Sequence, residues 1–220
     1  MQKKRIGMSL FGVIVCAISV GIFKIAALGV DPFQSLMSGL DAKIPIGFGT
    51  LYVIVNLLLL IFGLVVDRHN IGIATFINLF LLGYITQFTF EQLQKVIVEP
   101  SLPVRFLCLV IGIVIICFGS AFYMTADLGV STYDAIAIVF AYKWKVAKFP
   151  YCRIATDIVC VLAGSALLYL GNGSLETLLS NVSVGTIITA FFMGPLIAFF
   201  NQKVARPFLG VDAEGNAIEK

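Results

Sequence analysis

Charge is scarce in this sequence, and its scarcity first excludes a soluble protein. Only 12% of the 220 residues are charged, and 60% are hydrophobic. Soluble domains carry about 25% charged residues and roughly 45–50% apolar ones. No soluble core could bury this much apolar surface, so we expect the chain to lie in a lipid bilayer.

The residues and motifs of common catalytic and metal sites are also missing. The sequence has no HExxH, no GxSxG and no glycine-rich nucleotide-binding loop. Its only histidine is His69, and its five cysteines form no CxxC pair, so a metal centre lacks converging ligands. We therefore expect no enzyme, no cofactor and no coupling to ATP, although a membrane enzyme that uses Asp and Arg alone stays an alternative.

Long apolar runs are what the sequence has instead. A run of about 20 apolar residues can cross a hydrocarbon layer roughly 30 Å thick. Each such run must be a helix, because lipid offers no partner for backbone N–H and C=O groups. The first run is too long for a signal peptide, so we expect it to be a retained span. The predicted spans are 6–26, 48–66, 71–90, 104–126, 151–170 and 182–200.

Lysine and arginine are unevenly distributed between the two sides that these spans imply. With the N-terminus in the cytoplasm, only Lys24, Lys43, Lys95 and Arg105 of the 15 basic residues lie on the outer side. This bias is the positive-inside pattern of membrane proteins. Both termini are therefore expected in the cytoplasm, and the basic clusters mark topology rather than a nucleic-acid partner.

The sequence repeats itself with a period of three spans. Residues 5–30 align without gaps with residues 105–130, and the closing spans align at an offset of 111. Because three is odd, the second copy must enter the membrane from the opposite side. We predict an all-α fold of six transmembrane helices in two inverted three-helix repeats, within a single membrane domain over 1–220. The repeats cover about 4–95 and 101–203, and a polar cytoplasmic tail follows at 204–220.

Each repeat is interrupted after its first span by a similar polar motif. The first copy is ALGVDPF at 27–33 and the second is DLGVSTY at 127–133. In each copy the glycine can end a helix in the left-handed conformation. A new helix can then begin, because Asp31 and Pro32 suit its N-cap and first turn, and Ser131 with Asp134 fits a capping box. We predict short half-helices over 32–42 and 132–143, each too short to span alone and therefore re-entrant.

Paired helix breaks in inverted repeats point to a solute site at the repeat interface. Helix N-termini there would favour an anion or carboxylate. Arg153 lies one helical turn before Asp157, so the two can pair, and Asn56 corresponds to Asp157 if the offset of the repeat is 101 there. Two alternatives stay open: the breaks are ordinary interfacial turns, and Arg153 lies at the cytoplasmic interface with Asp157 as a structural partner. The predicted site residues are Asp31, Pro32, Gln34, Ser35, Asn56, Ser131, Thr132, Tyr133, Asp134, Arg153 and Asp157.

These motifs resemble the YitT/YczE family of bacterial integral membrane proteins over about residues 4–205. The resemblance rests on R-x6-G near the start, on the repeated LGV-[DS]-[PT]-[FY] break, and on the helix that closes each half. Its matched positions are Thr75, Ile77, Phe80, Gly83 and Phe88 with Thr186, Ile188, Phe191, Gly194 and Phe199. The tail at 203–220 is short, so the YczE-like branch, without a soluble C-terminal domain, is the closer match. The resemblance implies the bacterial plasma membrane and assigns no residue a role.

Two function classes follow from the sequence. The leading one is a secondary transporter or facilitator of a small polar or anionic solute, with Asp31 and Asp134 as proton-coupling or amine-binding groups. The alternative is a non-transporting accessory, assembly or sensor protein that acts through a partner. The lipid bilayer is the one expected partner in both cases, and protein partners stay unknown.

Overall fold

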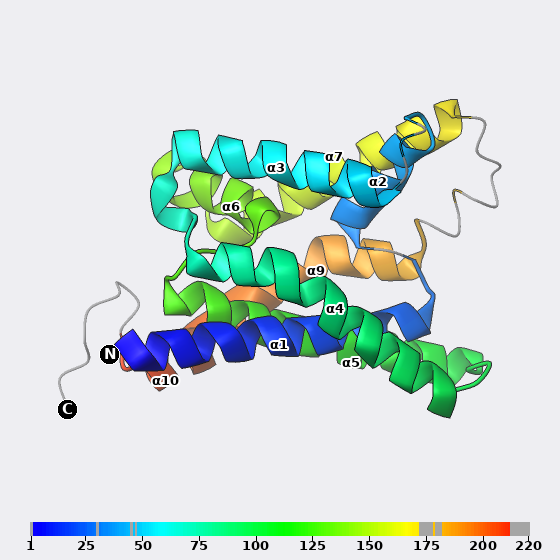
Figure 1. Ribbon diagram of the computed structural model, residues 1–220, viewed down its shortest axis with the longest axis horizontal. Helices are drawn as coiled ribbons and strands as arrows, with labels where there is room; N and C mark the ends of the chain where they lie inside the picture. Colours follow the sequence, from blue (N-terminus) through cyan, green and yellow to red (C-terminus); the bar gives the residue numbers. More distant parts are fainter. Residues whose placement is uncertain are drawn as a thin grey trace. The chain divides into compact units, whose positions relative to one another are not determined.

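The computed structural model describes residues 2–29, 31–44, 46, 48–171, 178 and 182–211, and its regular elements over these residues are helices (Figure 1). The short elements η2 and η3 are π-helical turns, and η1 is a 3-10 turn. The elements are α1 (Gln2–Ala26), α2 (Pro32–Asp41), α3 (Phe48–Val66), η1 (Arg68–Asn70), α4 (Ile73–Val96), α5 (Leu102–Ala126), α6 (Thr132–Ile138), η2 (Val139–Lys143), α7 (Phe149–Leu170), α9 (Val184–Phe200), η3 (Asn201–Ala205) and α10 (Arg206–Leu209).

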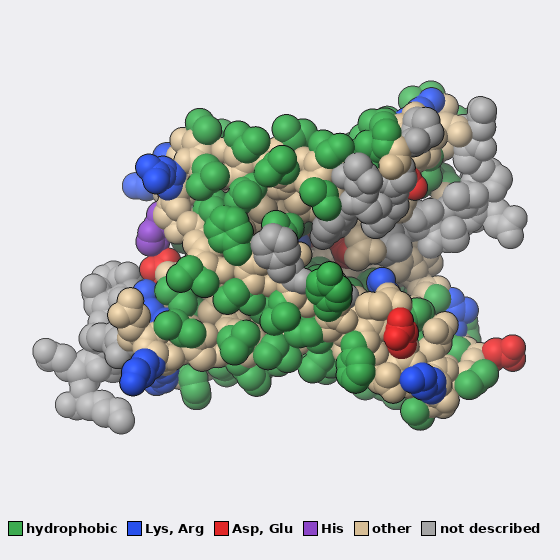
Figure 2. All heavy atoms as spheres, in the orientation of Figure 1, with side chains coloured by type: hydrophobic (Ala, Val, Ile, Leu, Met, Phe, Trp, Pro, Cys, Tyr) green, Lys and Arg blue, Asp and Glu red, His purple; other side chains and the backbone are tan. Residues whose placement is uncertain are grey.

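Five of the expected spans are helices long and apolar enough to cross a membrane. They are α1, α4, α5, α7 and the continuous segment Val184–Leu209, which joins α9, η3 and α10. The remaining expected span corresponds to α3, in which the apolar stretch found over the described residues, Val53–Val66, is shorter than a span. Six spans therefore stay a prediction. Figure 2 shows hydrophobic side chains along the visible faces of α1, α3 and α4, as lipid contact requires.

The chain forms two compact units, and each unit combines segments from both halves of the sequence. Unit 1 consists of Met1–Ala26, Arg68–Ser131 and Pro195–Lys220, and unit 2 consists of Ala27–Asp67 and Thr132–Gly194. Unit 1 therefore holds the first helix of each predicted repeat, whereas unit 2 holds both short half-helices. The predicted repeats follow one another in the sequence, whereas each compact unit contains segments from both of them.

Within unit 1, α1 and α5 cross as antiparallel helices with their backbones in close approach. A Cβ atom at Gly12 would lie 2.7 Å from both the Gly119 carbonyl oxygen and the Tyr123 amide nitrogen. Two turns along the same crossing, the Ser19 hydroxyl donates to the Gly112 carbonyl over 2.5 Å. Small residues of this kind allow helices to pack closely in a membrane.

The ends of this helix pair are joined by two equivalent arginines. The Arg105 guanidinium donates to the Ala26 carbonyl over 2.7 Å. Arg5, at the corresponding place in the first repeat, donates to the Asp127 carboxylate over 3.3 Å. Cations at helix C-termini are stabilising, since they satisfy terminal carbonyls and oppose the negative end of the dipole.

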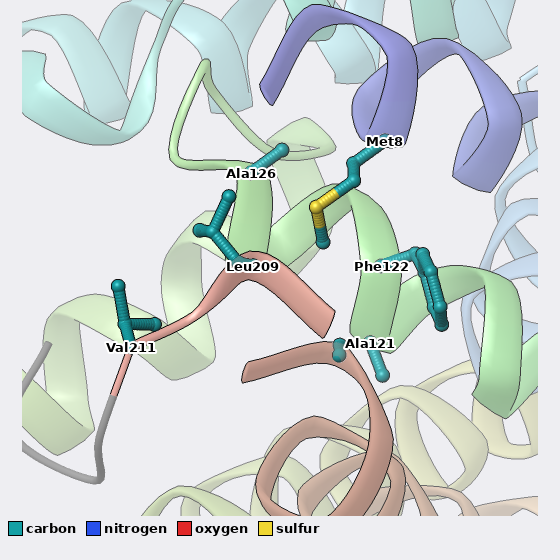
Figure 3. Packing of buried hydrophobic residues seen from close by; sticks show 7 residues of the cluster. Met8, Ala121, Phe122, Ala126, Leu209 and Val211 are labelled. Atoms are coloured by element: carbon teal, nitrogen blue, oxygen red, sulfur yellow. The ribbon is translucent and has the colours of Figure 1, made fainter. Parts of the chain in front are cut away.

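The C-terminal segment of unit 1 packs on the same helix pair. Met8 of α1 and Phe122 of α5 form a buried cluster with Leu209 of α10 and with Val211 just beyond it (Figure 3). The Lys4 ammonium lies 4.8 Å from the centre of the Phe208 ring, in a cation–π contact. The end of the Val184–Leu209 segment is thus anchored to the beginning of α1.

Both predicted helix breaks exist, although the helices end earlier than the glycines. Helix α1 ends at Ala26 and α5 ends at Ala126, and the next residues adopt the left-handed conformation, Ala27 with φ 46° and Asp127 with φ 56°. Gly29 and Gly129 follow with φ 111° and 105°. Our expectation that the glycine itself ends each helix was wrong. A left-handed residue other than glycine, two positions before the glycine, ends each helix instead.

The glycines are needed for close approach to a neighbouring helix. A Cβ at Gly29 would lie 2.6 Å from the Thr186 hydroxyl, and one at Gly129 would lie 2.7 Å from the Thr75 hydroxyl. Thr186 and Thr75 occupy equivalent positions of the two closing helices. Each break therefore packs against the start of a closing helix.

The crossing of α1 and α5 gives a direct test. Replacing Gly12 by alanine forces the two backbones apart, and we expect a loss of about 1–3 kcal/mol, the usual cost of overpacking. Gly7 lies on the same helix, and a Cβ added there would meet nothing within 4 Å, so Gly7→Ala is the matched control and gains helix propensity. Thermal unfolding in detergent measures both. Equal melting temperatures for the two variants would contradict the close crossing.

Candidate functional site

The candidate site lies in unit 2, where each short half-helix runs beside the middle helix of the other predicted repeat. Helix α2 packs on α7 in a parallel direction: Gly39 meets the backbone of Gly164, and the Lys43 ammonium donates to the Leu170 carbonyl over 2.5 Å. Helix α6 packs on α3 in the same manner, and the Lys143 ammonium donates to the Val66 carbonyl. This exchange brings the start of each half-helix beside polar residues of α3 and α7.

Asp31 caps helix α2 as the sequence predicts. Its Oδ1 atom accepts hydrogen bonds from the amides of Phe33 over 3.0 Å and Gln34 over 3.2 Å. Pro32 occupies the first turn, where a missing N–H costs nothing. The anion at this helix N-terminus is therefore the protein's own carboxylate.

Arg153 of α7 lies at the centre of a buried ionic network. Its Nε donates to Asp157 Oδ2 over 3.2 Å, and its Nη1 donates to Asp134 Oδ1 of α6. The Tyr133 hydroxyl donates to the other Asp157 oxygen over 2.5 Å, and the Tyr133 ring lies 4.5 Å from the guanidinium carbon. Arg153 and Asp134 are each 6% exposed and Asp157 is 0% exposed. The predicted pairing of Arg153 with Asp157 is confirmed, and Asp134 joins it.

The burial of Arg153 shows that its guanidinium does not extend to the protein surface. A snorkelling arginine at the cytoplasmic interface would keep its guanidinium exposed, whereas this one is enclosed by three side chains of α6 and α7. A glycine makes room for it, since a Cβ at Gly194 of α9 would lie 3.2 Å from Arg153 Cβ and 2.9 Å from the Pro150 carbonyl oxygen. The charge pair within α7 is thus part of a core network rather than a surface pair.

A second polar contact joins α6 to α3. The Thr132 hydroxyl donates to the Asn56 side-chain oxygen over 2.7 Å, and both side chains are buried. At a repeat offset of 101, Asn56 of α3 corresponds to Asp157 of α7. The first residues of α6 therefore contact both middle helices.

Asp31 lies beside this network, because Phe33, two residues further along the chain, stacks on Tyr133. Asp31 is partly exposed, unlike Asp134 and Asp157. The guanidinium of Arg153 thus bonds two buried carboxylates, and a third carboxylate lies nearby. Among the described residues, no group of three His, Cys, Asp or Glu side chains is arranged to hold a metal ion.

The structure brings most of the predicted site residues together, and it adds others. Asn56, Thr132, Tyr133, Asp134, Arg153 and Asp157 lie at the start of α6 and beside it on α3 and α7, and Asp31 is adjacent. Pro32, Gln34 and Ser35 follow Asp31 on α2, where Ser35 is fully buried. Ser131 belongs to unit 1.

Two neighbours of the network were not predicted. Phe33 stacks on Tyr133 with ring centres 5.0 Å apart, and Cys160 belongs to the same buried cluster. Phe33 and Tyr133 are equivalent positions of the two breaks, so the repeat alignment contained the signal for their contact. Cys160 lies three residues after Asp157, and only the position on that helix face could have indicated it.

Comparison with known proteins gives a family without an assigned activity. The model of the family described as "Family of unknown function (DUF6198)" matches residues 3–202. The chain belongs to this family. No solved structure matches it.

Two bacterial proteins are similar to this DUF6198 member over most of its length. "Uncharacterized protein YyaS" of Bacillus subtilis is 22% identical over 204 residues, which cover 93% of this chain and 96% of that protein. An "Uncharacterized protein" of Haemophilus influenzae is 24% identical over 208 residues, which cover 93% of this chain and 87% of that protein. Neither name states an activity, and neither match shows membership of the YitT/YczE family.

The network predicts an unequal response to the loss of its charges. Arg153→Gln leaves Asp134 and Asp157 buried without their cation, and we expect a loss of about 3–5 kcal/mol, the usual cost of breaking a buried ion pair. Adding Asp134→Asn and Asp157→Asn removes that excess charge, so part of the stability should return. Lys148→Gln, at the exposed start of the same helix, is the control. Thermal unfolding measures these variants and the wild type, and a triple variant no more stable than Arg153→Gln would contradict the network.

Proposed function

We propose that this protein is a secondary transporter or facilitator of a small polar or anionic solute. One observation carries the proposal: a buried arginine with two carboxylates lies where the half-helices α2 and α6 begin. Ionisable groups buried inside a membrane protein are expensive, and they commonly mark substrate or ion pathways. The sequence offers no catalytic motif to accompany them, so we favour binding and passage over chemistry.

The proposal includes two inverted repeats, and matched contacts support them. The Gly185 amide donates to the Leu28 carbonyl over 2.8 Å, and the Ala74 amide donates to the Leu128 carbonyl over 2.9 Å. These donors are equivalent at an offset of 111 and the acceptors at an offset of 100. Repeated local contacts of this kind are expected from duplicated and inverted halves.

The lysines after the two half-helices repeat the same relation. Lys43 and Lys143 are equivalent at an offset of 100. Each donates to a carbonyl at the end of the helix beside it, Lys43 to Leu170 and Lys143 to Val66. The ends of the half-helices therefore match as their beginnings do.

We further propose a multi-pass location in the bacterial plasma membrane, with six spans and both termini in the cytoplasm. The positive-inside distribution of lysine and arginine supports the orientation, and the bacterial origin of both relatives agrees with the location. Membership of the wider YitT/YczE group remains part of this proposal, resting on the repeated break motif.

An accessory or sensor protein is the second candidate. It is favoured by the mutual satisfaction of the network, since Arg153 already has two carboxylate partners and Asp157 has two donors. In a protein of this class, the role of the network is to fix the packing of α6 on α7. A protein of this class would bind a partner stoichiometrically and no small solute.

A ligand screen followed by uptake tests transport. A solute that binds the native protein must raise its melting temperature, so the purified protein is screened against polar and anionic metabolites, and hits are assayed for uptake into proteoliposomes. Asp31→Asn and Asp134→Asn should each reduce uptake at least about tenfold, which is the effect expected from the loss of one hydrogen bond to a charged group. Asp41→Asn, at the far end of α2, is the control.

Two results would decide against the proposal. Uptake that is unchanged in both variants would remove Asp31 and Asp134 from the site. A stoichiometric protein partner, together with no stabilising solute, would favour the accessory class.

A further inference from the structure

Two stacked aromatic rings cover the arginine of the buried network. The Tyr133 ring lies over Arg153, with its centre 4.5 Å from the guanidinium carbon. The Phe33 ring stacks on Tyr133, with ring centres 5.0 Å apart and ring planes inclined by 26°. One face of a ring cannot hold both neighbours, so Arg153 and Phe33 lie on opposite faces of Tyr133. Phe33 is therefore the outer layer of this cover, and Tyr133 is the inner layer.

The two rings are held in place by different kinds of contact. The Tyr133 hydroxyl donates to Asp157 Oδ1 over 2.5 Å, so this ring cannot move without breaking a hydrogen bond to a carboxylate, which is one of the strong kinds. The side chain of Phe33 has no hydrogen-bonding atom, and it packs in a buried cluster with Met37 and Cys160. Its displacement costs packing contacts and no hydrogen bond. Phe33 is therefore the ring that can move.

Cys160 marks the surface that Phe33 covers. It belongs to the same buried cluster as both rings, and it lies three residues after Asp157, on the same face of α7. Phe33 and Cys160 are each 7% exposed and Tyr133 is 8% exposed, so this face of α7 is closed to water. Asp31 is partly exposed, and its Oδ1 accepts a hydrogen bond from the Phe33 amide over 3.0 Å. The covered surface therefore begins beside a residue that water reaches.

The two rings belong to the first turns of the two half-helices, at equivalent positions of the predicted repeats. Phe33 and Tyr133 are related by an offset of 100, and a contact between equivalent residues lies on the two-fold axis that relates them. A shift of α2 away from α6 therefore separates the rings. We propose that Phe33 is the gate of the solute site: its ring leaves Tyr133 to admit solute to the face of α7 that carries Asp157, and it returns when the solute has passed.

Thiol labelling of the full-length protein in lipid vesicles tests the gate without a known solute. The reagent is 2-aminoethyl methanethiosulfonate, which is small and water-soluble, and peptide mass spectrometry gives the rate at each cysteine. A buried thiol reacts only when its surroundings open. Phe33→Ala removes the outer ring, so Cys160 should react at least about tenfold faster than in the wild type, equal to about 1.4 kcal/mol in the opening equilibrium. Cys152, also buried on α7, should keep its wild-type rate. Cys160 should keep its own rate in the control Phe122→Ala, which removes a buried ring of unit 1.

The outcomes separate the gate from the proposed function, on which only the passage of solute rests. An unchanged Cys160 rate in Phe33→Ala would overturn the gate, as would an equal rise at Cys152, which would show a general loosening of α7. If Phe33→Ala does not fold, Phe33→Leu removes the stacked ring and keeps an apolar side chain, and an unchanged Cys160 rate in that variant overturns the gate. Faster labelling of Cys160 without uptake of any solute would leave the movable cover standing and remove transport. Uptake with an unchanged Cys160 rate would do the opposite.

Discussion

A helix that ends inside a membrane protein leaves carbonyl groups that lipid cannot satisfy, and this constraint organises the whole structure. The carbonyls of Leu28 and Leu128 lie just after such ends, and each accepts a bond from the first turn of a closing helix, at Gly185 and Ala74. The Thr75 hydroxyl adds a bond of 2.7 Å to the Val130 carbonyl. These bonds hold the breaks in place, and the breaks determine where α2 and α6 begin.

The position of the half-helices then determines the chemistry. Since α6 begins directly after its break, Tyr133 and Asp134 lie in its first turn, beside Arg153 of α7. Since α2 begins after the other break, Asp31 caps it, and Phe33 in its first turn stacks on Tyr133, whose ring lies beside the same arginine. A polar network in an apolar chain is thereby built from local signals: two helix stops, one cap and one pair of residues a helical turn apart. Its hydrogen-bonding groups satisfy one another.

The sequence predicts the local parts of this arrangement well. Apolar runs locate five membrane-type helices, turn residues locate both breaks, and spacing alone predicts the Arg153–Asp157 pair. It does not predict which helices pack together, because periodicity gives the face of a helix and not its neighbour. The contact of Asp134 with Arg153 depends on α6 lying beside α7, and the stacking of Phe33 on Tyr133 depends on the two half-helices meeting at their first turns. The left-handed Ala27 and Asp127 were also missed, because local propensity favours the nearby glycines.

The central claim is that the two halves are equivalent and lie in the membrane with opposite orientation. Lys43 and Lys143 are equivalent exposed residues after α2 and α6, and the native cysteines are all buried. Lys43→Cys and Lys143→Cys can therefore be compared by labelling with a membrane-impermeant thiol reagent, in intact cells and in inside-out vesicles. Inverted repeats predict that the thiol at position 43 reacts from the outside and the thiol at position 143 only from the cytoplasmic side. Labelling of both positions from the same side would contradict the inverted repeat and the transport mechanism built on it.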